Sequence, residues 1–281
     1  MQVGMICANG KLMFSSRAQR SPLAFFLVVI GLAVPIFVLS RFVGVLGSLK
    51  IPVTDLMLAF TPLVAASILV LRYEGVSGLK TFIRFSLNIR SLWRSNWLLP
   101  ALLLAPLIYA LTYLSLQIAG YPGSPTGNFV GLPALALIMF LLAIGEEAGW
   151  TGYLLDPLQL RFGALGASLI IAVPWWLAHI PSIIQIGGTV SDIAWWLPGA
   201  IALRVLMTWL FNHSGGSVFA VILFHTLLNV GRSVTYPAIG SHYDPVYQAT
   251  GNIIAVILAA IILLGWGVKG LTTMKPPSMK R

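Results

Sequence analysis

The stretch VGLPALALIMFLLAIGEEAGWTGYLL, residues 130–155, is a long apolar segment that carries two adjacent carboxylates, Glu146 and Glu147. A single charged side chain at the centre of a membrane helix costs roughly 2.5–3.5 kcal/mol on insertion scales, so carboxylates at this depth require a partner or a function. Because adjacent helical residues point about 100° apart, we expect one carboxylate to face a site. The other is expected to meet a structural partner.

The composition of the chain is that of a membrane protein. Hydrophobic residues make up 58% of the sequence and charged residues only 9%, against about 25% charged residues in soluble domains. Membrane β-barrels would show short alternating segments instead. The formal charge of +10 lies mostly between apolar segments, which indicates contact with lipid headgroups rather than with nucleic acid. The single cysteine, Cys7, excludes an internal disulfide. We predict an all-α polytopic protein whose main partner is the lipid bilayer.

Apolar stretches of bilayer length predict about eight membrane-spanning helices. We place a cytoplasmic N-terminal segment at 1–22, one transmembrane domain at 23–268 with its motif-bearing core at about 130–234, and a C-terminal tail at 269–281. The predicted spans are Leu23–Val43, Asp55–Leu71, Asn96–Gln117, Val130–Leu155, Gly163–Ile184, Ile193–Phe211, Gly216–Val234 and Asn252–Val268.

The distribution of Lys and Arg predicts the orientation, since cytoplasmic loops carry an excess of both residues. With both termini in the cytoplasm, the opposite side keeps only Arg41, Lys50 and Arg232. One cytoplasmic segment, 75–94, interleaves apolar side chains with Lys and Arg. This pattern favours a helix lying in the membrane interface, with an ordinary basic loop as the alternative.

Two further predicted spans carry polar residues at depth. His179 follows Trp175 by one helical turn, and Asn229 follows His225 by one turn, so each pair shares a helix face. An imidazole beside an amide suits metal binding or donation to a developing oxyanion, although His and Asn also form hydrogen bonds that only join helices. The pattern is not the HExxH zinc helix. His213 and His242 fall in predicted loops, and we assign them no role.

The three polar segments resemble the motifs of the CAAX protease and bacteriocin-processing family. The matching residues are Glu146-Glu147 with Gly149-Trp150-x-Gly152-Tyr153-Leu154, then Trp175-x-x-x-His179, then His225-x-x-x-Asn229, preceded by the loop Asn212–Ser217. The resemblance covers residues 130–229. It implies an eight-helix intramembrane endopeptidase, in a bacterial cytoplasmic membrane, that cleaves a membrane-associated or prenylated peptide or protein.

The resemblance also implies roles for individual residues. Glu146 would activate water with assistance from His179, and His225 with Asn229 would stabilise the tetrahedral oxyanion. A second interpretation of the family makes Glu146, His179 and His225 zinc ligands. One Glu, two His and one Asn are a poor set for a closed tetrahedral zinc site, so we favour a metal-free mechanism and keep zinc as the alternative.

One residue departs from the family pattern. The family usually has an Arg four residues after the second glutamate, where this chain has Thr151. Arg204 lies deep in the sixth predicted span without an acidic residue in the same helix. We therefore predict that Arg204 pairs with Glu147, the alternative being that it reaches the membrane surface or an aqueous cavity.

The location and nature of the site follow from the same motifs. Glu146, His179, His225 and Asn229, supported by Glu147, Arg204 and Trp175, are predicted to meet in one cavity that opens toward the cytoplasmic half. A non-catalytic family member that binds membrane partners, and a proton-coupled transporter, remain the alternative functions.

Overall fold

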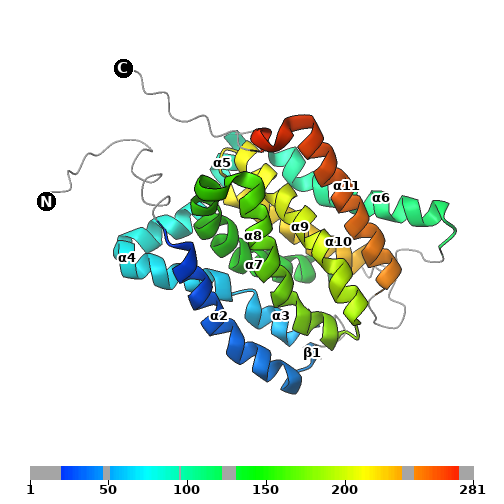
Figure 1. Ribbon diagram of the computed structural model, residues 1–281, viewed down its shortest axis with the longest axis horizontal. Helices are drawn as coiled ribbons and strands as arrows, with labels where there is room; N and C mark the ends of the chain where they lie inside the picture. Colours follow the sequence, from blue (N-terminus) through cyan, green and yellow to red (C-terminus); the bar gives the residue numbers. More distant parts are fainter. Residues whose placement is uncertain (1–19, 47–50, 95, 122–130, 236–243, 272–281) are drawn as a thin grey trace, which may run out of the picture.

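The computed structural model describes residues 20–46, 51–94, 96–121, 131–235 and 244–271. These residues form a bundle of helices with one two-residue antiparallel pairing between β1 and β2 (Figure 1). In chain order the elements are α2 (Pro22–Leu39), η1 (Ser40–Phe42), β1 (Val45–Leu46), β2 (Ile51–Pro52), α3 (Val53–Leu58), α4 (Thr61–Ser86), α5 (Ile89–Arg94), α6 (Leu98–Ile118), α7 (Leu132–Gly149), the π-helical turn η3 (Trp150–Leu155), α8 (Asp156–Gln185), α9 (Val190–His213), α10 (Val218–Thr235) and α11 (Pro245–Gly270).

Each predicted span lies mainly in helical structure, which confirms the all-α polytopic membrane fold. Six stretches of the described chain are long and apolar enough to cross a bilayer. One of them, Leu132–Gln185, contains two predicted spans. These two spans are separated at Gly163, whose φ of 71° turns the chain inside α8. The second predicted span is α3 followed by the first part of α4.

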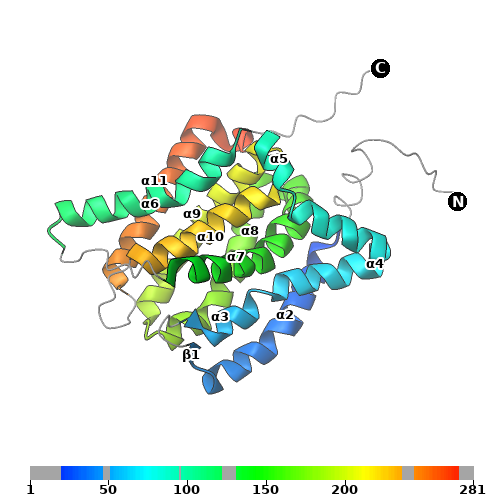
Figure 2. The same ribbon diagram turned by 180° about the vertical axis from the view of Figure 1, so that it is seen from behind.

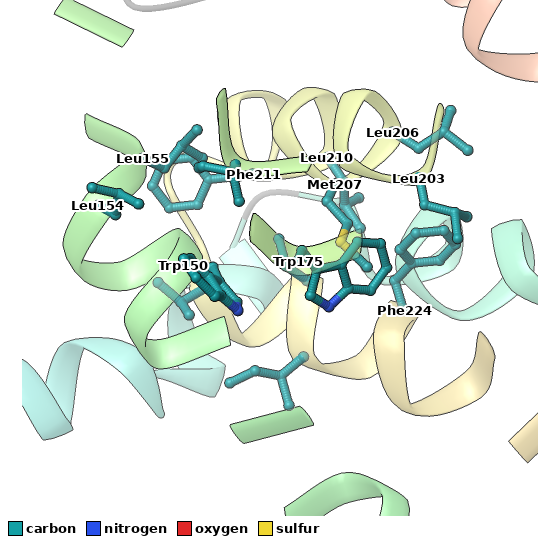
Figure 3. Close-up of a cluster of buried hydrophobic side chains, with 14 of the residues drawn as sticks. Trp150, Leu154, Leu155, Trp175, Leu203, Leu206, Met207, Leu210, Phe211 and Phe224 are labelled. Carbon is teal, nitrogen blue, oxygen red and sulfur yellow. The ribbon is translucent and has the colours of Figure 1, made fainter. Parts of the chain in front are cut away.

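The motif-bearing helices lie at the centre of the bundle. Helix α7 packs against α4 on one side and α10 on the other, while α8 packs against α9 and α9 against α11. Helices α2, α3 and α4 lie on one flank in Figure 1. Figure 2, which views the molecule from behind, shows α6 and α10. Side chains from η3, α8, α9 and α10 form the buried core around Trp150, Trp175 and Phe224 (Figure 3). This core holds the polar residues of the central helices at defined positions.

Close packing between α7 and its neighbours depends on two glycines. A Cβ atom at Gly145 would lie 2.7 Å from the Ala59 carbonyl oxygen, and one at Gly149 would lie 2.4 Å from the Pro62 carbonyl carbon. Small residues spaced by four let membrane helices approach closely. The two glycines bracket Glu146 and Glu147, so this approach also determines the depth of the carboxylates.

The predicted interfacial segment is helical rather than a loop. Helix α4 bends at Gly75, where φ is 69°, and α5 follows after Ser86. Phe82 and Leu92 are buried, whereas Arg84 and Arg90 are exposed. This division of apolar and cationic side chains is the one that an interfacial helix requires.

The described cations concentrate at one end of the bundle. Arg20, just before α2, donates to the Gly152 carbonyl oxygen at 3.2 Å and to Glu74 of α4 at 3.1 Å. These contacts bring the start of α2, the middle of α4 and the end of the α7–η3 segment to the same end. Arg161 lies near the beginning of α8, at this end as well. The opposite end carries Arg41 and Arg232.

Candidate active site

The three sequence motifs meet in one cavity of about 790 Å³. Glu146 of α7, His179 of α8, and His225 and Asn229 of α10 all line it, together with Trp175. The structure therefore brings the residues of the three motifs together at one cavity. A cavity of this size falls within the range of about 300–1,000 Å³ found for ligand pockets.

Glu146 is held at the cavity wall by an aromatic donor. Its side chain lies in the last turn of α7, immediately before the π-helical turn η3, and the residue is 8% exposed. The Trp175 indole Nε1–H donates to Glu146 Oε2 at 2.6 Å. Trp175 thus anchors one carboxylate oxygen, and the other oxygen is oriented toward His225.

Glu147 is fully buried and serves as a three-way acceptor. Its Oε2 accepts from Arg204 Nη1 at 2.9 Å and from the Thr151 hydroxyl at 2.5 Å. Its Oε1 lies 2.9 Å from His225 Nδ1. The predicted ion pair with Arg204 is present, and the two adjacent carboxylates have different partners as the helical rotation requires.

Arg204 reaches the site from α9 and is 2% exposed. Its guanidinium carbon lies 4.2 Å from the centroid of the Trp175 ring, within the range of a cation–π contact. The Trp175 ring therefore contacts Arg204 with its face and Glu146 with its N–H. Within the described residues, Arg204 Nε and Nη2 have no hydrogen-bond partner. The face of the Trp175 ring and the Glu147 carboxylate therefore provide most of the interactions that offset the cost of burying the guanidinium charge.

His225 lies between the two glutamates. Its Nδ1 contacts Glu147 Oε1, while its Nε2 lies 3.9 Å from Glu146 Oε1. An ionised carboxylate only accepts hydrogen bonds, so Nδ1 carries the proton in this contact. The Nε2 atom then faces Glu146 and the cavity, as an acceptor in the neutral ring or as a donor in the imidazolium.

His179 lines the cavity without contacting the glutamates. Its Nδ1 is 2.8 Å from the Trp175 carbonyl oxygen of the same helix, and this oxygen can only accept. The ring packs edge-on against Trp175 and Trp196. No ion pair joins His179 to either glutamate in the described part of the chain. Its Nε2 is therefore left to face the cavity.

The donor set does not fit a metal ion in this arrangement. Among the described residues, no three His, Cys, Asp or Glu side chains lie close enough together to hold one. Glu146 Oε1 and His225 Nε2 are 3.9 Å apart, and His179 forms no ion pair with either glutamate. We derive no step through zinc.

The structure places several residues that the sequence motifs did not indicate. Thr151 is a hydrogen-bond donor to Glu147, which its position four residues later on the same helix would have indicated. The Ser182 hydroxyl donates a hydrogen bond to the Asp55 carboxylate. Both residues line the cavity, and so does Arg232. Ser182 and Arg232 each lie three residues after a motif residue, His179 and Asn229, but are not part of the motifs.

The loop prediction for His213 is wrong. This residue ends α9, and its ring packs among Trp97, Trp209 and Trp266. The Trp97 and Trp266 rings pack against this last residue of the helix. His242 lies outside the described residues.

The position of the cavity along the bundle bears on the prediction that it opens toward the cytoplasmic half. Its lining residues on α2, α8 and α11 lie in the middle or in the half farther from the cation-rich end. Trp150 and Glu146 line the part of the cavity that is nearer to that end. If the cation-rich end is cytoplasmic, the cavity lies mainly in the opposite half of the membrane.

Comparison with known proteins agrees with the geometry. A family model described as Type II CAAX prenyl endopeptidase Rce1-like matches residues 128–231. The chain is 26% identical over 216 residues to CAAX prenyl protease 2 of Methanococcus maripaludis, which covers 72% of this chain and 78% of the relative. The matched region contains all three motifs whose residues meet in the cavity. Over the region that carries its three motifs, the chain is therefore similar to the Rce1-like CAAX prenyl endopeptidases.

Proposed function

We propose that this endopeptidase hydrolyses a peptide bond in a membrane-associated or prenylated substrate, with Glu146 as the base that activates water. The observation that carries the proposal is the 3.9 Å separation of Glu146 Oε1 and His225 Nε2 at the wall of the cavity. This arrangement places the Glu146 carboxylate, which would accept a proton from water, beside His225 Nε2. That nitrogen would contact the negative charge that develops on the substrate carbonyl oxygen. A general base of this kind contributes about 10²–10⁴-fold to the rate.

The reaction proceeds in two proton transfers. Glu146 takes a proton from water as the water oxygen bonds to the scissile carbonyl carbon, and the carbonyl oxygen becomes an oxyanion. His225 in its imidazolium form and the Asn229 amide donate to that oxygen. Glu146 then gives its proton to the leaving nitrogen as the carbon–nitrogen bond breaks, which releases an amine and a carboxylic acid.

The Glu147 network orients His225 for this role. A carboxylate on Nδ1 holds an imidazole in one tautomer and one ring orientation. Arg204 and Thr151 in turn hold Glu147. Arg204 thus provides from α9 the cation that the family usually carries at the position of Thr151, which removes the reason to regard this departure as a sign of a non-catalytic protein. His179 assists from the cavity wall. Its Nδ1 atom contacts the Trp175 carbonyl oxygen of its own helix, and its Nε2 atom faces the cavity.

The surroundings of the cavity favour a substrate with an apolar part in the membrane. Ile30, Val34 and Val38 of α2 line the cavity and are also more than half exposed on the outside of the bundle. Side chains that border both the cavity and the lipid provide an apolar path between them. The curated relative is named for prenylated substrates, and such a lipid would fit this path.

The test is cleavage of internally quenched peptides, prenylated and unprenylated, by the full-length protein in liposomes. Glu146→Gln should lower turnover at least about 100-fold while the protein stays folded, because the amide oxygen still accepts from Trp175. Glu74→Gln, which changes a carboxylate outside the cavity, is the matched control and should retain activity. Normal turnover by Glu146→Gln would refute the base assignment. Absence of cleavage by the unaltered protein, with retained peptide binding, would instead favour a non-catalytic binding protein.

A further inference from the structure

Asp55 is a cavity carboxylate that the proposed mechanism does not use. It lies in the first turn of the short helix α3, is half-buried and lines the same cavity as Glu146 and His179. Helix α3 packs against α8 (Figure 1), and the Ser182 hydroxyl of α8 donates to Asp55 Oδ1. Asp55 therefore lies at the α8 wall of the cavity, on the side of His179 that is nearer to the end of the bundle with few cations.

The Asp55 carboxylate has no cationic partner in the described part of the chain. No Lys, Arg or His there lies within ion-pair distance of it, and this includes Arg232, which lines the cavity from α10. Its Oδ2 atom has no hydrogen-bond partner among the described residues and is not enclosed by them. Ionisable side chains that face a cavity within a membrane protein typically mark a substrate or ion pathway. The negative charge is therefore available to a ligand in the cavity.

A hydrogen-bond network holds this carboxylate in place. Thr54 and Ser182 are buried, and their hydroxyl oxygens lie 3.3 Å apart. The Thr54 hydroxyl also lies 2.6 Å from Gln185 Oε1, to which it donates. Gln185 Nε2 in turn donates to the Ser40 and Val43 carbonyl oxygens at 2.7 and 2.9 Å. The network joins α3, α8 and the segment after α2, and a group that is fixed in this way loses little freedom when it binds a ligand.

We propose that Asp55 binds a cationic side chain, Lys or Arg, of the peptide substrate and is a specificity-determining residue. This inference rests on the proposed function. Hydrogen bonds between a carboxylate and an ammonium or guanidinium group are among the strongest in proteins. His179 and Ser182 share a face of α8 and are separated by about 4.5 Å along its axis. Because an extended peptide spans about 3.3–3.6 Å per residue, the cation belongs to a residue within about two positions of the scissile bond.

The experiment compares pairs of internally quenched peptides in liposomes of zwitterionic lipid that contain the full-length protein. One peptide of each pair carries Lys near the scissile bond, and the other carries acetyl-lysine at the same position, which keeps the length of the side chain and removes its charge. The first and second positions on either side of the bond are each tested. We expect kcat/KM for Lys to exceed that for acetyl-lysine by about 10-fold or more at one of these positions, the range for a hydrogen bond to a charged group. Equal or poorer cleavage of the Lys peptide at every position would overturn the inference.

Variants test whether the preference for Lys comes from Asp55. Asp55→Asn keeps an oxygen that accepts from Ser182 but removes the charge, so it should make the two kcat/KM values equal, mainly through KM. Asp55→Glu should retain part of the preference. Glu74→Gln, which changes a carboxylate outside the cavity, is the matched control and should leave the preference unchanged. A preference that persists in Asp55→Asn would belong to another group and would refute the role of Asp55.

Binding measurements separate this inference from the proposed function. Glu146→Gln lacks the proposed base, so the binding of the same peptides to it reports recognition without turnover. Tighter binding of the Lys peptide than of the acetyl-lysine peptide supports the inference even if the unaltered protein cleaves neither. Equal binding refutes it. Rapid but equal cleavage of both peptides by the unaltered protein would remove the role of Asp55 and leave the peptidase function intact.

Discussion

Arg204 of α9 donates to Glu147 of α7 at 2.9 Å, and both residues are almost completely buried. This contact joins two helices through residues that are 57 positions apart in the chain. It also connects the cation to His225, since Glu147 contacts both. One ion pair thus supports both the packing of the bundle and the orientation of a proposed catalytic ring.

Replacing Arg204 by Leu should destabilise the protein by about 3–5 kcal/mol, because the Glu147 carboxylate would stay buried without its cation. The free energy of unfolding in detergent, measured by denaturant titration, tests this expectation. Arg72→Leu, at an exposed cation of α4, is the control and should change stability little. Adding Thr151→Arg to Arg204→Leu should recover part of the loss. Equal stability of the Arg204 and Arg72 variants would contradict the structural role of the pair.

Gly149→Ala should destabilise the bundle by about 1–3 kcal/mol through overpacking. The added methyl would meet the backbone of Pro62, which cannot rotate away as a side chain can. Gly31→Ala is the matched control, because a Cβ atom there meets nothing within 4 Å. Thermal unfolding of both variants in detergent measures the difference. A neutral Gly149 variant would show that α4 and α7 separate at little cost.

Chelators should leave peptide cleavage unchanged if the reaction is metal-free, as we propose from the poor fit of the donor set. The measurement is kcat/KM before and after incubation with a strong zinc chelator, with a known zinc peptidase treated in parallel. Inhibition that added zinc reverses would assign Glu146, His179 and His225 a metal-binding role. It would leave the peptidase assignment in place.

The orientation of the protein can be measured with single cysteines introduced after Cys7→Ser. Val190 is 82% exposed at the cation-poor end, and Ser77 is exposed on α4 near the cation-rich end. If both termini are cytoplasmic, Val190→Cys should react with a membrane-impermeant maleimide in intact cells. Ser77→Cys should react only after the membrane is broken. The reverse pattern would place the cavity on the cytoplasmic side.

Much of the candidate site was predictable from spacing along single helices. His225 and Asn229 share a face because four residues make about one turn, and Glu146 and Glu147 diverge for the same reason. The Arg204–Glu147 pair was predicted from two buried charges that lacked partners in their own helices. Such predictions succeed because the cost of an unpaired charge in the membrane is high whichever way the helices pack.

The sequence by itself determined the helical membrane fold, the positions of the spans and the residues of the three motifs, because hydropathy and helical periodicity are local properties of the chain. Only the tertiary structure decided that Trp175 donates to Glu146, that His213 ends α9 rather than lying in a loop, and that the cavity occupies the half away from most cations. It alone placed Arg232 in the cavity. These features depend on the rotation and depth of each helix against its neighbours, which close contacts such as that between Gly149 and Pro62 determine and which no single segment encodes.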